Sequence, residues 1–263
     1  MQLKVKPKIA VVMPAFNAAR TLRKTWEDLP HDIVDHVILV DDNSTDDTVD
    51  IARQLGLQIF VHDRNYGYGA NQKTCYSLAL QTNAAVIVMV HPDYQYDPTL
   101  LPKIVKPLID DSADIVFGSR LLASDPMAAG MPWWKYWANR FLTKLENVVF
   151  GLNLSEYHTG YRAYNRKALE AVNYQMNSDA FVFDQEIVAQ FVVLGLRITE
   201  VPVPTRYFPQ ASSASVLQSV RYGLEILVVL LRYILHAGHI ARHRPFESLS
   251  NRYRDVTDDA PKS

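Results

Sequence analysis

Hydrophobic residues in the first 120 positions form short continuous runs that alternate with amphipathic stretches. The runs predict strands at 9–13, 36–40, 58–61, 84–90 and 114–118. They are rich in valine and isoleucine, which is typical of parallel strands covered on both faces. The stretches between them predict helices at 18–29, 46–55, 70–81 and 98–110. This alternation indicates an α/β fold with a doubly wound, mostly parallel sheet flanked by helices.

The pattern changes after Arg120, where a Pro/Ala/Gly-rich stretch at 124–131 predicts a linker. Beyond it the pattern predicts a strand at 197–203 and helices at 133–150, 181–194 and 216–240. We therefore divide the chain into an α/β region at 1–125 and a second region at 126–246 that completes the same domain. The polar residues at 247–263 predict a disordered tail.

The helix predicted at 133–150 is amphipathic. Its apolar face carries Trp134, Trp137, Phe141, Leu145 and Val148. Its opposite face carries Lys135, Asn139, Thr143 and Glu146. Tryptophan with interspersed basic residues suits the headgroup region of a membrane, and the alternative is a helix that packs its tryptophans into the core. The helix at 216–240 leaves a similar choice between a membrane interface and a helix or dimer contact.

Composition limits the location and the partners of the chain. The net charge of −1 gives no reason to expect a nucleic-acid partner. Cys75 is the only cysteine, so no disulfide can form within the chain, which fits a reducing compartment. We find no signal peptide and no apolar run of the ~18 residues that a spanning helix needs. These features predict a cytoplasmic protein, peripheral at the cytoplasmic face of a membrane.

Polar residues gather where the predicted strands end. The segments are Pro14-Ala15-Phe16-Asn17 after the first strand, Asp41-Asp42 after the second, His91-Pro92-Asp93 after the fourth and Gly118-Ser119-Arg120 after the fifth. The carboxyl ends of parallel strands meet at one rim of the sheet, and ligands of doubly wound folds bind outside that rim. The sequence therefore predicts a site at this edge.

Two motifs near the rim have a functional and a structural interpretation. Asp41 and Asp42 could accept hydrogen bonds from a base or ribose, or could serve a turn and a helix cap. Gly67 and Gly69 open a predicted helix, where the backbone can approach an anionic ligand. A simple turn explains this glycine pair equally well.

Two further sets of side chains leave the same choice open. His91 and Asp93 could hold a divalent cation that bridges a diphosphate, or could belong to a polar loop. Asp184 and Glu186 could supply a general base. At the start of a predicted helix they could also simply favour the helix dipole.

Taken in order, these motifs resemble family 2 glycosyltransferases of the GT-A fold, in particular the dolichyl-phosphate mannosyltransferase-like branch. The matching segments are 12–17, 40–46, 65–70, 91–98, 118–120, 159–162, 183–186 and 200–204. Each motif alone is loose, but eight in the right order are specific at the level of a family. The C-terminal amphipathic and apolar helices would complete the GT-A domain.

The resemblance implies a role for each matched position. A nucleotide-sugar-binding set would comprise Pro14, Ala15, Asn17, Asp41, Asp42, Gly69, Lys73 and Arg206. Acceptor-binding residues would be Arg162 and Ser213. Catalytic residues would be Asp93, Arg120, Asp184 and Glu186, and metal ligands His91, Asp93 and Gln95.

Two positions depart from the family's pattern. The family usually has an acid where Asn17 stands, and an Asp-x-Asp motif where this chain reads His91-Pro92-Asp93. Imidazole suits Mn²⁺, whereas Mg²⁺ prefers oxygen ligands. We therefore expect a divalent metal cofactor, with both Mn²⁺ and Mg²⁺ as candidates.

The expected activity is an inverting transfer of a hexose from a nucleotide-diphosphate sugar, of the GDP-mannose or UDP-glucose type, to a polyprenyl-phosphate-like lipid acceptor. One alternative is a saccharide or other hydroxyl acceptor, for which Asp184 or Glu186 would be the base. Another is a nucleotide-sugar-binding protein with weakened catalysis, of which His91 would be the sign. The sequence leaves a homo-oligomer open.

Overall fold

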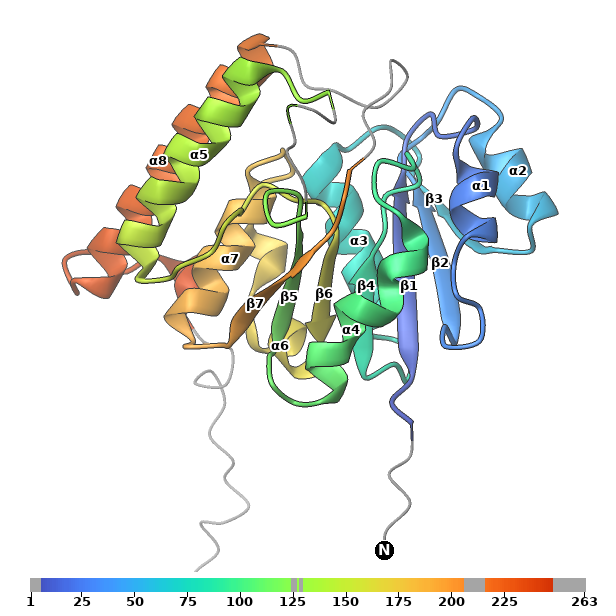
Figure 1. The fold of residues 1–263 in the computed structure, drawn as a ribbon, viewed down its shortest axis with the longest axis horizontal. Coiled ribbons are helices and arrows are strands. Elements are labelled where there is room, and N and C mark those ends of the chain that lie inside the picture. The colour runs from blue at the N-terminus through green and yellow to red at the C-terminus, as the bar shows by residue number, and fades with distance from the viewer. Residues whose placement is uncertain (1–5, 124–126, 128–129, 206–215, 248–263) are drawn as a thin grey trace, which may run out of the picture.

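The structure, a computed structural model of the 263-residue chain, describes residues 6–123, 127, 130–205 and 216–247. Seven strands form one sheet in the order β3-β2-β1-β4-β6-β5-β7 (Figure 1). They are β1 (Ile9–Ala15), β2 (His36–Asp41), β3 (Gln58–Val61), β4 (Val86–Met89), β5 (Ile115–Ser119), β6 (Arg162–Asn165) and β7 (Ile198–Pro202). Every strand predicted from the sequence is present, with ends shifted by at most two residues.

One strand, β6, runs against the others and is missing from the prediction. It pairs antiparallel with both β4 and β5 and so separates them. The pairs β1–β2, β1–β4, β2–β3 and β5–β7 are all parallel. The four residues of β6 read Arg-Ala-Tyr-Asn, which is too short and too polar to form an apolar run. Because β6 and β7 follow residue 126, both regions of the chain contribute strands to one sheet.

Helices cover both faces of the sheet. The helices α3 (Tyr68–Ala79), α6 (Arg166–Ala171) and α7 (Phe183–Val193) pack on one face. The opposite face carries α1 (Leu22–Glu27), α2 (Thr48–Gln54) and α4 (Leu101–Ile109). Short 3-10 helices lie at Pro98–Leu100, Tyr174–Met176 and Arg244–Phe246. Successive residues of β1 enter opposite cores, which explains its uninterrupted apolar sequence.

Two long helices, α5 (Trp133–Phe150) and α8 (Val216–Ala237), lie side by side at one flank of the molecule (Figure 1). The rings of Phe150 and Tyr233 meet with centroids 4.9 Å apart. Gly223 brings α8 close to α5, since a Cβ there would lie 3.9 Å from Leu142. Among the described residues, no helix combines the length and apolar character that crossing a membrane requires.

The orientation of α5 rules out the alternative in which its tryptophans enter the core. Trp137, Phe141 and Val148 are 63%, 67% and 75% exposed. The residues of the opposite face that point inward are Asn139, Thr143 and Glu146, all buried. The polar face of α5 thus turns toward the protein and Trp137, Phe141 and Val148 turn outward, while Leu142, Leu145, Val149 and Phe150 pack against the core.

The first residue of β6, Arg162, is a buried cation. The Arg162 guanidinium donates to the carbonyl oxygens of Thr159 at 2.7 Å, Tyr157 at 2.8 Å and Asp184 at 3.1 Å. It also lies 3.5 Å from the Asp184 carboxylate and over the ring of Phe117. Because a buried charge is stable only when it is paired and hydrogen-bonded, these groups fix one another.

We expect Arg162→Met to lower the free energy of unfolding by about 3–5 kcal/mol, because it leaves the Asp184 carboxylate buried without its cation. Urea unfolding followed by circular dichroism measures this change. The control is Arg53→Met, which breaks an ion pair with Asp50 whose side chains are both 68% exposed. It should cost about 0–1 kcal/mol. Similar costs for the two variants would show that the buried cation does not hold β6.

Candidate active site

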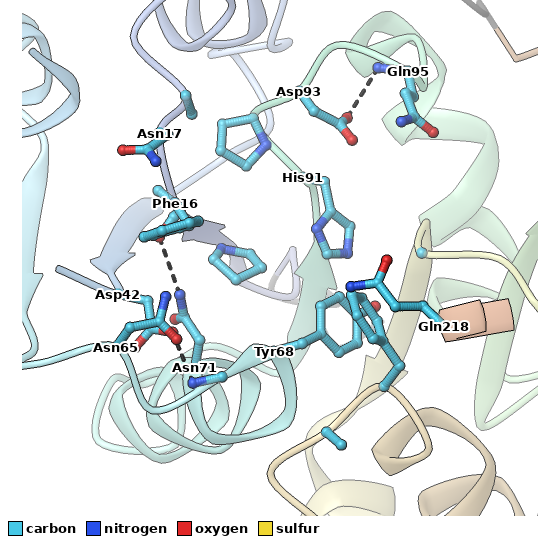
Figure 2. A pocket seen from close by; sticks show the side chains of 18 of the residues that line it. Phe16, Asn17, Asp42, Asn65, Tyr68, Asn71, His91, Asp93, Gln95 and Gln218 are labelled. Carbon is cyan, nitrogen blue, oxygen red and sulfur yellow. Dashed lines mark hydrogen bonds between the residues drawn. The ribbon is translucent and has the colours of Figure 1, made fainter. Parts of the chain in front are cut away.

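A cleft of about 1450 Å³ opens at the carboxyl ends of the parallel strands. Its walls include the residues that follow β1, β2, β4 and β5, as the position of the rim predicts. Phe16, Asn17 and Asp42 lie on one side and Gln218 on the other, with His91 between them (Figure 2). The sequence-predicted site residues that line the cleft are Pro14, Ala15, Asn17, Asp42, His91, Asp93, Gln95 and Arg120.

Hydrogen bonds between neighbouring loops fix the first wall. Asn17 adopts a φ of 51° and donates its backbone N–H to Ser44 Oγ at 2.8 Å. Its side-chain oxygen accepts from the Thr45 N–H at 2.9 Å. Asp41 accepts from the N–H and hydroxyl of Ser44, at 2.8 and 2.5 Å. Asp41 is fully buried and shapes this wall from behind, as the turn interpretation expects.

Asp42 lines the cleft, but its carboxylate binds the loop that leads into α3. It accepts from the backbone N–H groups of Tyr66 and Gly67, each at 2.9 Å. His62 Nδ1 lies 2.7 Å from the same carboxylate. Asp42 as a whole is 3% exposed, so its main effect is to hold the Tyr66–Gly67 backbone at the cleft wall.

Gly69 and Lys73 both hold the loop that precedes α7. The Gly69 N–H donates to the Asp179 carbonyl at 2.8 Å, and a Cβ on Gly69 would lie 2.9 Å from the Ala180 carbonyl oxygen. Lys73 donates to the Asn177 carbonyl and pairs with Asp179 at 2.7 Å. Neither Gly69 nor Lys73 is among the described residues that line the cleft, whereas Asp179 and Ala180 are.

His91 forms part of the central wall. Its ring stacks on Tyr68, with centroids 5.7 Å apart and planes 2° from parallel. Gly160 covers its edge, since a Cβ at Gly160 would lie 2.9 Å from His91 Nε2. That nitrogen is buried and has no hydrogen-bond partner among the described residues. Burial lowers the pKa of His91, which keeps the ring neutral and able to act as a ligand.

Asp93 and Gln95 follow His91 at the cleft (Figure 2). Asp93 accepts from the Gln95 N–H at 3.0 Å, and burial raises the pKa of its carboxyl group. Within the described residues, no group of three or more His, Cys, Asp or Glu side chains could hold a metal alone. A cation carried mainly by a diphosphate needs only one or two protein carboxylates, and Asp93 with Gln95 fits that requirement.

Arg120 lines the far end of the cleft and is held by a buried acid that sequence analysis missed. Its Nε donates to Glu156 at 2.8 Å and its backbone N–H to the other oxygen of that carboxylate at 2.8 Å. Burial by itself raises the pKa of Glu156, but the charge and hydrogen bonds of Arg120 outweigh burial and lower it. No motif in the sequence marks Glu156, because its role depends on a contact made in three dimensions.

Three other predicted residues lie outside the lining of the cleft. Asp184 lies behind Tyr68, from whose hydroxyl it accepts at 2.8 Å, and Arg162 is buried beneath it. Glu186 accepts from the Ser178 N–H at 2.5 Å. Arg206 and Ser213 fall outside the described residues.

The end of the cleft beside Arg120 is completed by α8. Its lining residues are Gln218, Arg221, Tyr222 and Glu225. Their spacing of three, one and three residues puts them on one polar stripe of a helix that is otherwise apolar. That stripe is a sequence signal, and it could have identified α8 as part of the site.

The chain is similar in sequence to known glycosyltransferases. A UDP-N-acetylglucosamine–dolichyl-phosphate N-acetylglucosaminyltransferase of Methanococcus voltae is 24% identical over 86% of this chain and 98% of its own length. A dolichyl-phosphate hexose transferase of Haloferax volcanii is 29% identical over 75% of this chain and 82% of its own length.

Among solved structures, glucosyl-3-phosphoglycerate synthase from Mycobacterium tuberculosis, in complex with Mg²⁺ and UDP, has a TM-score of 0.68 at 18% identity. The match covers 86% of this chain and 79% of that one. The fold is that of a GT-A glycosyltransferase. The chain belongs to glycosyl transferase family 2, whose family model matches residues 10–172. The predicted family and fold are thus confirmed.

The contacts of Gly69 lead to a test of its structural role. In Gly69→Ala the added methyl group would meet the carbonyl oxygens of Ser178 and Ala180 and displace the cleft loop. We expect a loss of about 1–3 kcal/mol in unfolding free energy, measured by urea titration. The control, Gly223→Ala in α8, has room for the methyl group and should be neutral or stabilising by up to ~1 kcal/mol. Equal stability of both variants would contradict the tight packing at Gly69.

Proposed function

We propose that this enzyme transfers a hexose from a nucleotide-diphosphate sugar, of the GDP-mannose or UDP-glucose type, to a polyprenyl-phosphate-like lipid. One observation carries the proposal: α8 lines the cleft with polar residues and exposes apolar residues on its outer side. Such a helix suits an acceptor that has a charged head and an apolar chain. Relatives that act on dolichyl phosphate, and a structural neighbour that binds UDP, support the two substrate classes.

The proposed reaction is a single displacement with inversion. An ionised oxygen of the acceptor phosphate attacks the anomeric carbon of the sugar. The bond from that carbon to the diphosphate breaks, and the nucleoside diphosphate leaves with the electron pair. No proton moves, because the attacking oxygen is already ionised. Arg120 would bind the anionic acceptor phosphate and hold its attacking oxygen toward the anomeric carbon.

The carboxylates expected to serve as a base argue for a phosphate acceptor. Asp184 lies behind Tyr68, and Glu186 is bound to the Ser178 N–H. Neither is among the described residues that line the cleft. A hydroxyl acceptor needs a base within reach of its proton, and an ionised phosphate does not. Transfer to a saccharide hydroxyl remains the alternative, and full activity of the variant with both Asp184→Asn and Glu186→Gln would exclude these two residues as its base.

The donor would occupy the side of the cleft formed after β1 and β2. Pro14, Ala15 and Asn17 would contact the nucleoside, with Asp42 shaping the wall behind it. Asp93 and Gln95 would hold a divalent cation, Mn²⁺ or Mg²⁺, that neutralises the diphosphate. His91 Nε2 is buried against Gly160, so it gives no ground for choosing between Mn²⁺ and Mg²⁺.

A thermal-shift experiment tests the donor and metal roles. We expect UDP or GDP with Mn²⁺ to raise the melting temperature of the wild-type protein, because ligands stabilise the native state by mass action. In Asp93→Asn the extra shift due to the metal should disappear, and the transfer rate should fall by roughly 10²–10³-fold.

The control for this experiment is Asp97→Asn. Asp97 belongs to the same loop but caps a 3-10 helix through the Thr99 N–H and does not line the described cleft. It should keep the metal-dependent shift. A shift that is equal with and without metal in the wild-type protein would argue against a metal at Asp93.

We further propose that α5 and α8 lie against the surface of a membrane. Their outer surface consists of Trp133, Trp137, Phe141 and Val148 of α5 and Leu217, Val220, Leu224, Leu227, Leu231 and Ile234 of α8, all at least 41% exposed. Arg140 and Lys144 are also exposed on α5. An apolar patch of this size marks an interaction site, and tryptophan with basic residues favours anionic lipid as the partner. The cytoplasmic face of a membrane, which suits the unpaired Cys75, belongs to this proposal.

Flotation with vesicles that contain anionic phospholipid tests the outer surface. We expect the wild-type protein to float at low salt and the variant with Trp137→Glu and Phe141→Glu to stay in the dense fraction. Met176→Glu changes an apolar side chain that is 44% exposed outside this surface and should float like the wild type. A wild-type protein that fails to float would contradict the membrane proposal. A wild-type dimer that dissociates with the same two changes would assign the surface to another copy of the chain.

A further inference from the structure

A buried acid beneath the cleft is not explained by the residues that bind donor or metal. Glu156 is 0% exposed, in a loop between α5 and β6. A carboxylate without water is strongly unfavourable unless charges and hydrogen bonds compensate it. The charge of the Glu156 carboxylate is balanced by Arg120. The carboxylate also accepts a hydrogen bond from Asn139, which orients it.

Arg120 is bound to Glu156 through both its backbone and its side chain. The backbone N–H and Nε each donate at 2.8 Å, and Nη2 also donates to Glu156. Nη2 donates as well to the His158 carbonyl at 2.7 Å. Because one carboxylate holds both ends of the residue, it fixes the guanidinium at the end of the cleft that α8 completes, which is the end proposed for the acceptor.

Two other elements fix Glu156 in turn. Its backbone N–H donates to Glu200 Oε1 on β7 at 3.0 Å. Its carboxylate accepts from Asn139 Nδ2 on the inner face of α5 at 2.9 Å. Thr143 donates to Asn139 Oδ1 at 3.1 Å, and this bond orients the Asn139 amide so that its N–H₂ faces Glu156. The position of Arg120 is thus set from β7 and from α5.

We infer that Glu156, supported by Asn139, is the positioning residue that holds Arg120 toward the phosphate group at the acceptor end of the cleft. The inference rests on the proposed function, in which that phosphate belongs to the lipid acceptor. A guanidinium held in advance loses no conformational freedom when the anion arrives, and a misplacement of about 1 Å can cost roughly 10²-fold in rate. Glu156 itself acts only through Arg120.

A thermodynamic cycle separates this role from a general effect on folding. The proteins are the wild type, Glu156→Gln, Arg120→Gln and the double variant, assayed for transfer from the sugar nucleotide to a short-chain polyprenyl phosphate. We expect Glu156→Gln to lower kcat/KM for the acceptor by about 10²-fold while the KM for the donor stays unchanged. In the Arg120→Gln background, the same substitution should cause no further loss.

Equal losses from Glu156→Gln in both backgrounds would overturn the inference, because a structural role would not depend on Arg120. A parallel rise in the KM for the donor would also contradict it. If Glu156→Gln does not fold, as judged by circular dichroism, Asn139→Ala replaces it in the same cycle. This variant removes one hydrogen bond to the carboxylate, and its smaller loss must likewise vanish when Arg120 is absent.

Failure of the proposed function would look different. In that case the wild-type protein would transfer no sugar to the lipid phosphate. The same four proteins would then be compared by their affinity for a short-chain polyprenyl phosphate, measured by isothermal titration calorimetry. Dependence of the Glu156 effect on Arg120 in that binding would still support positioning, and independence would still refute it.

Discussion

The side of the cleft that α8 completes is assembled around the buried charge of Arg162. Its guanidinium binds carbonyl oxygens in the loop before β6 and at the start of α7, and pairs with Asp184. Loss of any of these acceptors would leave a buried positive charge partly uncompensated, which lowers the free energy of unfolding. The loop that it fixes carries Glu156 and His158 to the cleft, so a residue that does not line the cleft determines its shape. This differs from the acceptor contact that the family resemblance implies for Arg162.

The same logic explains the unusual polarity of α5. Asn139 and Glu146 point inward because their polar partners lie beneath the helix. Asn139 donates to Glu156, and Glu146 lies 3.1 Å from His158 Nε2. His158 in turn contacts Gln185 and Tyr222 across α7 and α8. With these polar positions turned inward, Trp137, Phe141 and Val148 lie outside. One helix thus combines side chains that support the loop beneath the cleft with an exposed apolar surface.

Much of the fold follows from local pattern, and the exceptions share a physical cause. Continuous Val/Ile runs identify the parallel strands, and polar residues after them identify the rim and part of its lining. Strand β6 is not predicted because its four residues form no apolar run. It pairs antiparallel between β4 and β5, two strands that are themselves buried. The sequence does not reveal the roles of Gly69, Lys73 and Glu156, because each role depends on a contact with a residue distant in sequence. Periodicity predicts two faces of α5, but it cannot reveal which one turns inward, and Leu145 of the predicted apolar face packs against the core.

The position of β6 between β4 and β5 also has a consequence for synthesis of the chain. Strands β1 to β4 find partners among segments already made, through short crossovers. Strand β5 pairs only with β6 and β7, which emerge from the ribosome after it and after the whole of α5. Until then its apolar sequence has an open edge, and such edges invite association with other chains. A nascent chain paused between these strands is thus the form of this enzyme most in need of a chaperone.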